Sequence, residues 1–327
     1  MNQSVSLSRR ISYALVIVGL FVIVRCDLGP ALVAGLFSYM LVDQADKGLR
    51  RAGASPLVAR WSAIGIFVVA AALLIFIFAS FIQLGLSRLP ILLDRLLPRI
   101  DALSNRFGLD LPIENVQELR ALLLEKVKEN ARSLTTTSRL LTRGFFQVIV
   151  AIASALLAFQ WDAAPAPLRE TPDETFLREC TDRFRLLAAS FERVMGAQVV
   201  IAAINTVVTA LFLFGAHVPF RGMLTLATFV CGMIPIAGNI ISNSLIVAAA
   251  LTMSDQMAVT ALVFLVVIHK AEYFLNSRIV GNAISTPMWI TLIGLIVGEA
   301  LMGVTGVILA PTLIFYFREE LKIIPAR

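Results

Sequence analysis

One apolar stretch near the C-terminal end restricts the fold of this chain most strongly. Residues 294–317 read GLIVGEALMGVTGVILAPTLIFYF, with four glycines, one proline and a single carboxylate, Glu299. In a water-soluble helix each glycine costs about 0.8–1 kcal/mol relative to alanine, whereas membrane helices use small residues to approach one another closely. The stretch therefore predicts a membrane helix. Glu299 is a candidate functional residue, because a charge inside a bilayer is costly.

The composition of the whole chain supports the same interpretation. Hydrophobic residues make up 58% of the sequence and charged residues 15%, and the mean hydropathy is +0.84. Apolar runs of about 18 residues or more recur, so we expect an all-α polytopic integral membrane protein with about eight transmembrane helices. The net charge of +6 fits the basic cytoplasmic loops of such proteins, and nucleic acid is not an expected partner. The cysteines and histidines lack metal-ligand spacing, so no metal or cofactor is expected.

Alternating apolar and charged stretches divide the chain into six segments. They are membrane spans 1 to 3 over 1–86, an extramembrane amphipathic helical insert over 87–143, span 4 over 144–161, a cytoplasmic helical loop over 162–195, spans 5 to 8 with the transport path over 196–317, and a cytoplasmic tail over 318–327. Residues 11–25 and 28–42 are each short for a span and predict a tight hairpin. The insert carries leucines at helical spacing. It is expected to pack on itself or on a neighbouring subunit, with a membrane-surface helix as the alternative.

The distribution of basic residues predicts the orientation. An even number of spans places both termini on the same side of the membrane. Lys and Arg are equally frequent on the two sides when the 87–143 insert is counted, and clearly more frequent on the side of the termini when it is left out. Long segments contribute little to orientation, so both termini are expected to be cytoplasmic.

The apolar region 223–251 is interrupted in its middle. The interrupting residues are Gly232, Pro235, Gly238, Asn239, Ser242 and Asn243. Pro235 lacks an amide hydrogen and disturbs the preceding turn, so the helix is expected to kink or open there. Interrupted helices form binding sites in transporters, which makes Pro235, Gly238, Asn239 and Asn243 candidates for a substrate or ion path. A proline kink satisfied by neighbouring helices is the alternative.

Further polar residues accompany the later spans. Glu272 and Arg278 flank the end of the seventh apolar region, where they fit a structural ion pair or, alternatively, a gating pair. Asn205 shares a helix face with other polar residues of the fifth span, at spacings near three, four and seven. Hydrogen bonding between helices explains that face as well as a transport path does.

The order of these features resembles the autoinducer-2 exporter family, the PerM-type permeases. The resemblance rests on the basic N-terminus with its early hairpin, the third span that leads into an amphipathic insert, the GMIPIAGN break, the EYFLNSRIVG stretch and the glycine-rich last span ending LAPTLIFYF. It covers nearly the full chain. It implies a multi-pass protein of the bacterial inner membrane that transports a small polar solute or ions such as Na⁺ or H⁺.

The family motifs map onto particular residues. The Ile-Pro-x-x-Gly motif falls on Ile234, Pro235 and Gly238. A second motif falls on residues 277–281, with serine at 277 where the family has proline, and the paired glycines of the last span fall on Gly298 and Glu299, so a carboxylate replaces the second glycine. Together with Gly303, these residues complete the expected path.

The sequence as a whole therefore predicts a membrane permease or exporter, gradient-driven or passive, that is a homo-oligomer in the lipid bilayer. No nucleotide-binding GxxxxGK[ST] motif occurs, so direct use of ATP is not expected. An oligomeric scaffold or regulator that binds a partner through the 87–143 insert is the alternative. An enzyme is not expected, because no nucleophile and base stand out as a pair.

Overall fold

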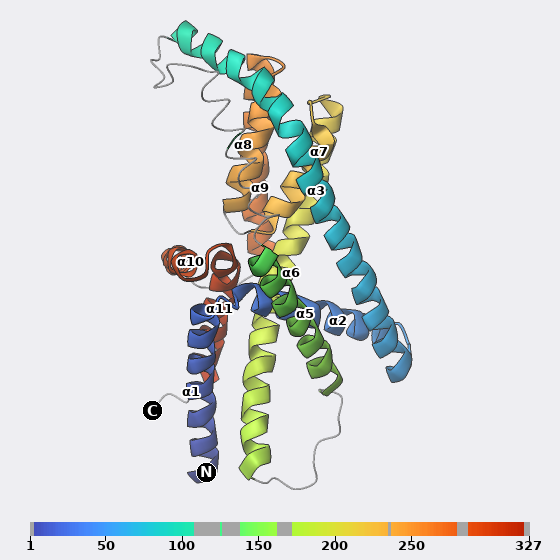
Figure 1. The fold of residues 1–327 in the computed structure, drawn as a ribbon, viewed down its shortest axis with the longest axis vertical. Coiled ribbons are helices and arrows are strands. Elements are labelled where there is room, and N and C mark those ends of the chain that lie inside the picture. The colour runs from blue at the N-terminus through green and yellow to red at the C-terminus, as the bar shows by residue number, and fades with distance from the viewer. Residues whose placement is uncertain are drawn as a thin grey trace. The chain divides into compact units, whose positions relative to one another are not determined.

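The protein is helical throughout the part of the chain that the structure describes. The computed structural model describes residues 3–107, 125, 138–161, 172–234, 237–279 and 287–323, and no strand occurs among them. The helices are α1 (Gln3–Arg25), α2 (Gly29–Arg51), α3 (Pro56–Phe107), α5 (Ser138–Trp161), α6 (Pro172–Gly215), α7 (Arg221–Gly232), α8 (Ala237–Leu251), α9 (Asp255–Ile279), α10 (Met288–Met302) and α11 (Val304–Ile323). The predicted all-α fold is confirmed (Figure 1).

Two compact units make up the chain. Unit 1 comprises residues 1–71, 142–196 and 282–327, and unit 2 comprises residues 72–141 and 197–281. Helices α3 and α6 each contribute one part to either unit. The core of unit 1 includes Leu36, Phe191 and Leu309, and the core of unit 2 includes Leu213, Leu224 and Ile246.

Several helices have the length and composition of membrane spans. Within the described residues, three stretches are long and apolar enough to cross a bilayer, namely Leu7–Arg25, Pro56–Gly85 and Thr175–Gly215. Three shorter apolar helical stretches accompany them, namely Gln147–Leu157, Gly238–Leu251 and Trp289–Met302. A polytopic chain fits this pattern. The number of eight crossings and the assignment of segments to either side stay predictions.

Helix α3 is continuous, so the predicted third span and the beginning of the predicted insert form one helix. Leu92 and Leu97, two leucines of the insert pattern, are only 1% and 6% exposed. Leu92 packs in the core of unit 2. This part of the leucine pattern is therefore covered by the chain itself and needs no neighbouring subunit. Of the rest of the insert, residues 108–137 except Glu125 lie outside the described residues, and residues 138–143 form the beginning of α5.

Helix α6 is also continuous, from Pro172 to Gly215. Helix α6 therefore includes residues of both the predicted helical loop over 162–195 and the predicted fifth span, and the boundary between loop and membrane at about residue 196 stays a prediction. Residues 162–171 lie outside the described part of the chain. Continuity arises because nothing between Phe191 and Gly215 breaks a helix: Gly196 alone is tolerated in a helix interior at a cost of about 1 kcal/mol.

The first two helices are separate, as predicted, but they do not form a tight hairpin. Asp27 has a positive φ of 54°, and α2 leaves the end of α1 at a wide angle instead of running back along it (Figure 1). The beginning of α2 packs on α11, because a Cβ atom at Gly29 would lie 2.5 Å from the Thr305 hydroxyl. Contact with α11 thus directs α2 away from α1.

The predicted last span over 288–317 is two helices. Helix α10 ends at Met302 and α11 begins at Val304, with Gly303 between them at a φ of 60°. The two helices fold back on each other, since Gly294 lies against Ile314 and the Gly298 backbone against the Gly306 backbone. Glycine suits the positive φ of residue 303, and it allows the backbone contact between residues 298 and 306. The glycine-rich stretch therefore forms a helical hairpin and not one long helix.

We expect Gly298→Ala to destabilise unit 1. A Cβ atom at residue 298 would lie 2.5 Å from the Gly306 carbonyl oxygen, and overpacking of this kind costs about 1–3 kcal/mol. Gly65→Ala is the matched control, because nothing lies within 4 Å of a Cβ atom there. Thermal unfolding in detergent measures both variants. Equal midpoints for Gly298→Ala and the parent would contradict the backbone contact between α10 and α11.

Candidate functional site

The helix interruption predicted for residues 223–251 is present in unit 2. Helix α7 ends at Gly232 and α8 begins at Ala237. The connection turns tightly, because the Ile234 amide donates to the Cys231 carbonyl oxygen at 2.8 Å. A Cβ atom at Gly238 would overlap the Cys231 carbonyl group, so only glycine fits at the start of α8. Pro235 and Ile236 lie outside the described residues.

A side chain of α6 satisfies the end of α7. The Gln198 amide nitrogen Nε2 donates to the Gly232 carbonyl oxygen at 2.7 Å. Gly232 also lets α7 approach α6, since a Cβ atom there would lie 3.2 Å from the Ala202 Cβ. A carbonyl freed by a helix end in an apolar environment costs several kcal/mol unless it finds a donor. Gln198 supplies that donor, and the interruption is a built feature of unit 2.

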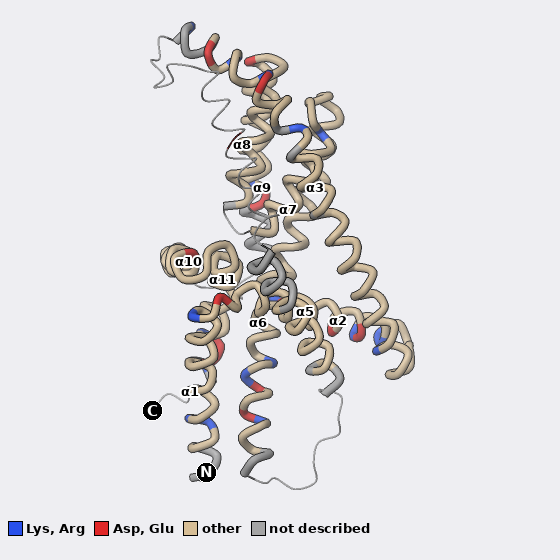
Figure 2. The backbone as a smooth tube through the Cα atoms, in the orientation of Figure 1, with Lys and Arg blue, Asp and Glu red and all other residues tan. Residues whose placement is uncertain are grey.

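The polar centre of unit 2 is a pair formed by Asn239 and Glu272. The Asn239 nitrogen Nδ2 donates to both carboxylate oxygens of Glu272 at 2.8 Å. Both side chains are half-buried, and α8 contains no charged residue. Figure 2 shows how sparse charge is along α7 and α8. The pair therefore joins α8 to α9.

The structure shows one partner of Glu272, and the pairing with Arg278 stays a prediction. Glu272 was expected to pair with Arg278 of the same helix, as a structural or gating ion pair. The side chain of Arg278 lies outside the described residues, and the described interaction is with Asn239. Asn239 and Glu272 stand out in the sequence because each is a polar residue in or beside an apolar stretch. Their hydrogen bond could not be predicted, because it depends on how α8 packs against α9.

Two further candidates lie in unit 2. Asn205 of α6 is half-buried, and its oxygen Oδ1 is buried without a hydrogen-bond partner among the described residues. Asn243 of α8 is half-buried, one turn beyond Asn239. An unsatisfied buried carbonyl oxygen is costly, so Asn205 is available to a polar molecule or ion that enters unit 2.

The remaining candidates lie in unit 1. Gly298, Glu299 and Gly303 belong to α10 and its turn into α11. The Glu299 backbone carbonyl accepts a hydrogen bond from the Gly303 amide at 2.7 Å, while its side chain is exposed. These residues belong to unit 1, whereas Asn239 belongs to unit 2. The coupling role expected for Glu299 stays a prediction.

Comparison with known proteins identifies the family. A model of the AI-2E family of transporters matches residues 11–325. The chain belongs to the AI-2E transporter family. It is also 30% identical over 138 residues to a protein of Bacillus subtilis (strain 168) named "Putative transport protein YdbI"; this match spans 42% of the chain and 39% of that protein.

Membership in the AI-2E family confirms the resemblance drawn from the sequence motifs. It identifies the chain as a member of a polytopic membrane family of transporters, in agreement with its apolar helices. The Asn239–Glu272 pair and the interruption before it lie within the matched residues 11–325. No group of three or more His, Cys, Asp or Glu that could hold a metal ion occurs within the described ranges.

A second polar cluster, which the sequence analysis missed, lies in unit 1. Arg183 is 7% exposed and pairs with Glu179 at 3.1 Å and with Glu320 at 3.2 Å. The Tyr13 hydroxyl donates to Glu320 at 2.9 Å, and Arg9 approaches Glu179 at 3.4 Å. This Arg183 cluster joins α1, α6 and α11. Only the i,i+4 spacing of Glu179 and Arg183 hinted at it.

We expect Arg183→Met to destabilise unit 1 strongly. The substitution leaves the Glu179 and Glu320 carboxylates, 8% and 5% exposed, without their central cation. Removing one partner of a buried pair costs about 3–5 kcal/mol. Arg185→Met is the control on the same helix, because Arg185 and its partner Asp182 are 50% and 52% exposed, and such pairs contribute about 0–1 kcal/mol. Chemical denaturation in mixed micelles compares the two, and equal losses would contradict a central role for Arg183.

The hydrogen bond between Asn239 and Glu272 gives a prediction for unit 2. Hydrogen bonds to a charged group contribute about 1.5–3 kcal/mol, so a double-mutant cycle of Asn239→Ala and Glu272→Ala should show a coupling energy of that size. Thermal unfolding of the four proteins measures it. Ser244→Ala replaces Asn239→Ala in the control cycle, since the Ser244 hydroxyl donates within its own helix. Additive losses for Asn239 and Glu272 would contradict their direct contact.

Proposed function

We propose that this AI-2E family transporter is a permease for a small polar solute or an ion, with the Asn239–Glu272 pair at the centre of the path. The single observation that carries the proposal is the half-buried Glu272 carboxylate held by the Asn239 amide at 2.8 Å. Ionisable groups within membrane helices are costly and mark ion and substrate pathways.

The charge balance of the pair supports an ion or a hydrogen-bonding solute as cargo. Asn239 is neutral, and no cationic side chain pairs with Glu272 among the described residues. The Asn239 amide therefore offsets none of the carboxylate charge, and a proton, Na⁺ or a donor group of a polar solute is a suitable counterpart. Asn205 and Asn243 extend the polar lining on α6 and α8, and the sequence adds Pro235 at the interruption.

Several finer properties belong to the same proposal. Transport is gradient-driven or passive, the chain lies in the bacterial inner membrane with both termini cytoplasmic, and it assembles as a homo-oligomer. Glu299, beside Gly298 and Gly303, serves ion coupling, and Arg278 gates the path together with Glu272. The distribution of Lys and Arg outside the long insert supports the orientation.

Flux through reconstituted protein tests the proposal. Asn239→Leu keeps a side chain suited to a bilayer but leaves Glu272 without its donor. Losing an interaction of about 1.5–3 kcal/mol should reduce flux roughly ten- to a hundredfold. Liposomes are tested with Na⁺ and H⁺ gradients and a panel of small polar solutes. Glu272→Gln removes the charge and separates ion transport, which it should abolish, from transport of a neutral solute.

The control for this experiment is Ser244→Leu, which places the same side chain on an exposed face of α8. It should transport like the parent. Each variant must retain the elution volume and helix content of the parent before flux is compared. Undiminished flux of every cargo in an Asn239→Leu plus Asn243→Leu protein would exclude this site.

A further inference from the structure

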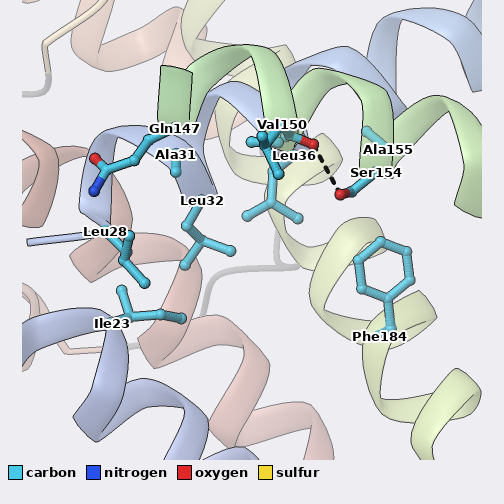
Figure 3. A pocket seen from close by; sticks show the side chains of 12 residues that line it. Ile23, Leu28, Ala31, Leu32, Leu36, Gln147, Val150, Ser154, Ala155 and Phe184 are labelled. Atoms are coloured by element: carbon cyan, nitrogen blue, oxygen red, sulfur yellow. Dashed lines mark hydrogen bonds between the residues drawn. The ribbon is translucent and has the colours of Figure 1, made fainter. Parts of the chain in front are cut away.

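An apolar groove in unit 1 has no role in the proposed path. It encloses about 570 Å³ and is lined by the end of α1 and by α2, α5 and α6 (Figure 3). Leu36 and Ala155, 2% and 6% exposed, form its floor. Val150, 47% exposed, and Ser154 stand at its open side. The groove is therefore a surface-open slot with a closed floor.

The lining of this groove suits a hydrocarbon and offers one free polar group. Apart from Gln147 and Ser154, every side chain in the lining is apolar. The Ser154 hydroxyl already donates to the Val150 carbonyl oxygen at 2.8 Å. Gln147 lies at the end of the groove away from Phe184 (Figure 3), and no hydrogen bond satisfies its amide within the described part of the chain. The groove thus has an apolar length and one polar end.

The groove continues an outward-facing surface of unit 1. The candidate span Leu7–Arg25 is only 6% buried in its most apolar window, and Val18 and Phe21 on it are 60% and 67% exposed. Such side chains face the acyl chains in a membrane. Ile23 of the same helix lines the groove. Ile23 lies on another face of α1 than Val18 and Phe21, so lipid reaches the groove at its open side on α5, where Val150 and the adjoining Ile149 are 47% and 45% exposed.

We propose that this groove binds one acyl chain of a membrane phospholipid, with the Gln147 amide directed toward the polar end of the lipid. The volume lies within the range of about 300–1,000 Å³ that is usual for ligand sites. A flexible acyl chain fits this apolar groove, because the Ser154 hydroxyl in its lining already donates a hydrogen bond to Val150. The site is separate from the Asn239–Glu272 pair and does not depend on the cargo.

Retention of lipid by the purified full chain tests the proposal. The protein is reconstituted into vesicles of phosphatidylethanolamine and phosphatidylglycerol, re-extracted in mild detergent and examined by native mass spectrometry. We expect the parent to retain one phospholipid per chain. Ser154→Phe and Ala31→Phe place a ring in the groove and should reduce the retained fraction about tenfold or more, because each excluded methylene weakens binding. Ala153→Phe, exposed on α5 outside the groove, should retain lipid like the parent.

A second measurement covers the case in which Ala31→Phe fails to fold. Phospholipid with a photoactivatable diazirine in its acyl chain should crosslink to residues 147–155 in nanodiscs, and Ser154→Phe, on the open side, should remove that crosslink while Ala153→Phe keeps it. Equal crosslinking and equal lipid retention in Ser154→Phe and the parent would overturn the proposal. So would a change of oligomer mass in Ser154→Phe without loss of lipid, which would identify the groove as an interface between copies.

Discussion

The need to satisfy every backbone polar group in an apolar environment governs this fold. In a bilayer no water replaces a lost helix hydrogen bond, so each helix end must find a partner inside the chain. At the end of α7 the partner is the Gln198 side chain, which donates to the Gly232 carbonyl oxygen. At the end of α10 it is the Gly303 amide, which donates to the Glu299 carbonyl oxygen. The carbonyl group at the end of α7 is thus hydrogen-bonded by a neighbouring helix, and the one at the end of α10 by the local turn.

Buried charge is handled differently in the two units. In unit 1, Arg183 stands between the carboxylates of Glu179 and Glu320, so opposite charges offset one another and the desolvation cost is partly recovered. In unit 2, the partner of the half-buried Glu272 within the described residues is the neutral amide of Asn239. The first arrangement is complete without a ligand and suits a structural junction. The second contains no cation among the described side chains, and this difference is the physical basis of the transport site proposed at Glu272.

The sequence predicted the features that depend on local chemistry. Apolar run length gave the all-α membrane fold, and Gly232, Pro235 and Gly238 predicted the interruption between α7 and α8. Features that depend on packing were missed. Gly303 was predicted to lie within one long span. A glycine-rich pattern is found both where helices pack closely and where the chain reverses direction, and the sequence does not distinguish the two. The continuity of α6 across residue 196 was missed because a change from charged to apolar composition does not end a helix. The pairing of Asn239 with Glu272 depends on the register between two helices, which spacing along the chain does not fix.

The two kinds of interruption also differ in how easily they move. Separating α10 from α11 would require Gly303 to change its left-handed conformation and would open the backbone contact of Gly298 with Gly306. Separating α7 from α6 breaks the single hydrogen bond from Gln198, worth about 0.5–1.5 kcal/mol net, and a glycine contact with Ala202. The contact of α7 with α6 is therefore the weaker of the two, whereas α8 is held against α7 by the close approach of Gly238 to the Cys231 carbonyl group. At the interruption between α7 and α8, movement of α7 relative to α6 therefore costs less than separation of α8 from α7.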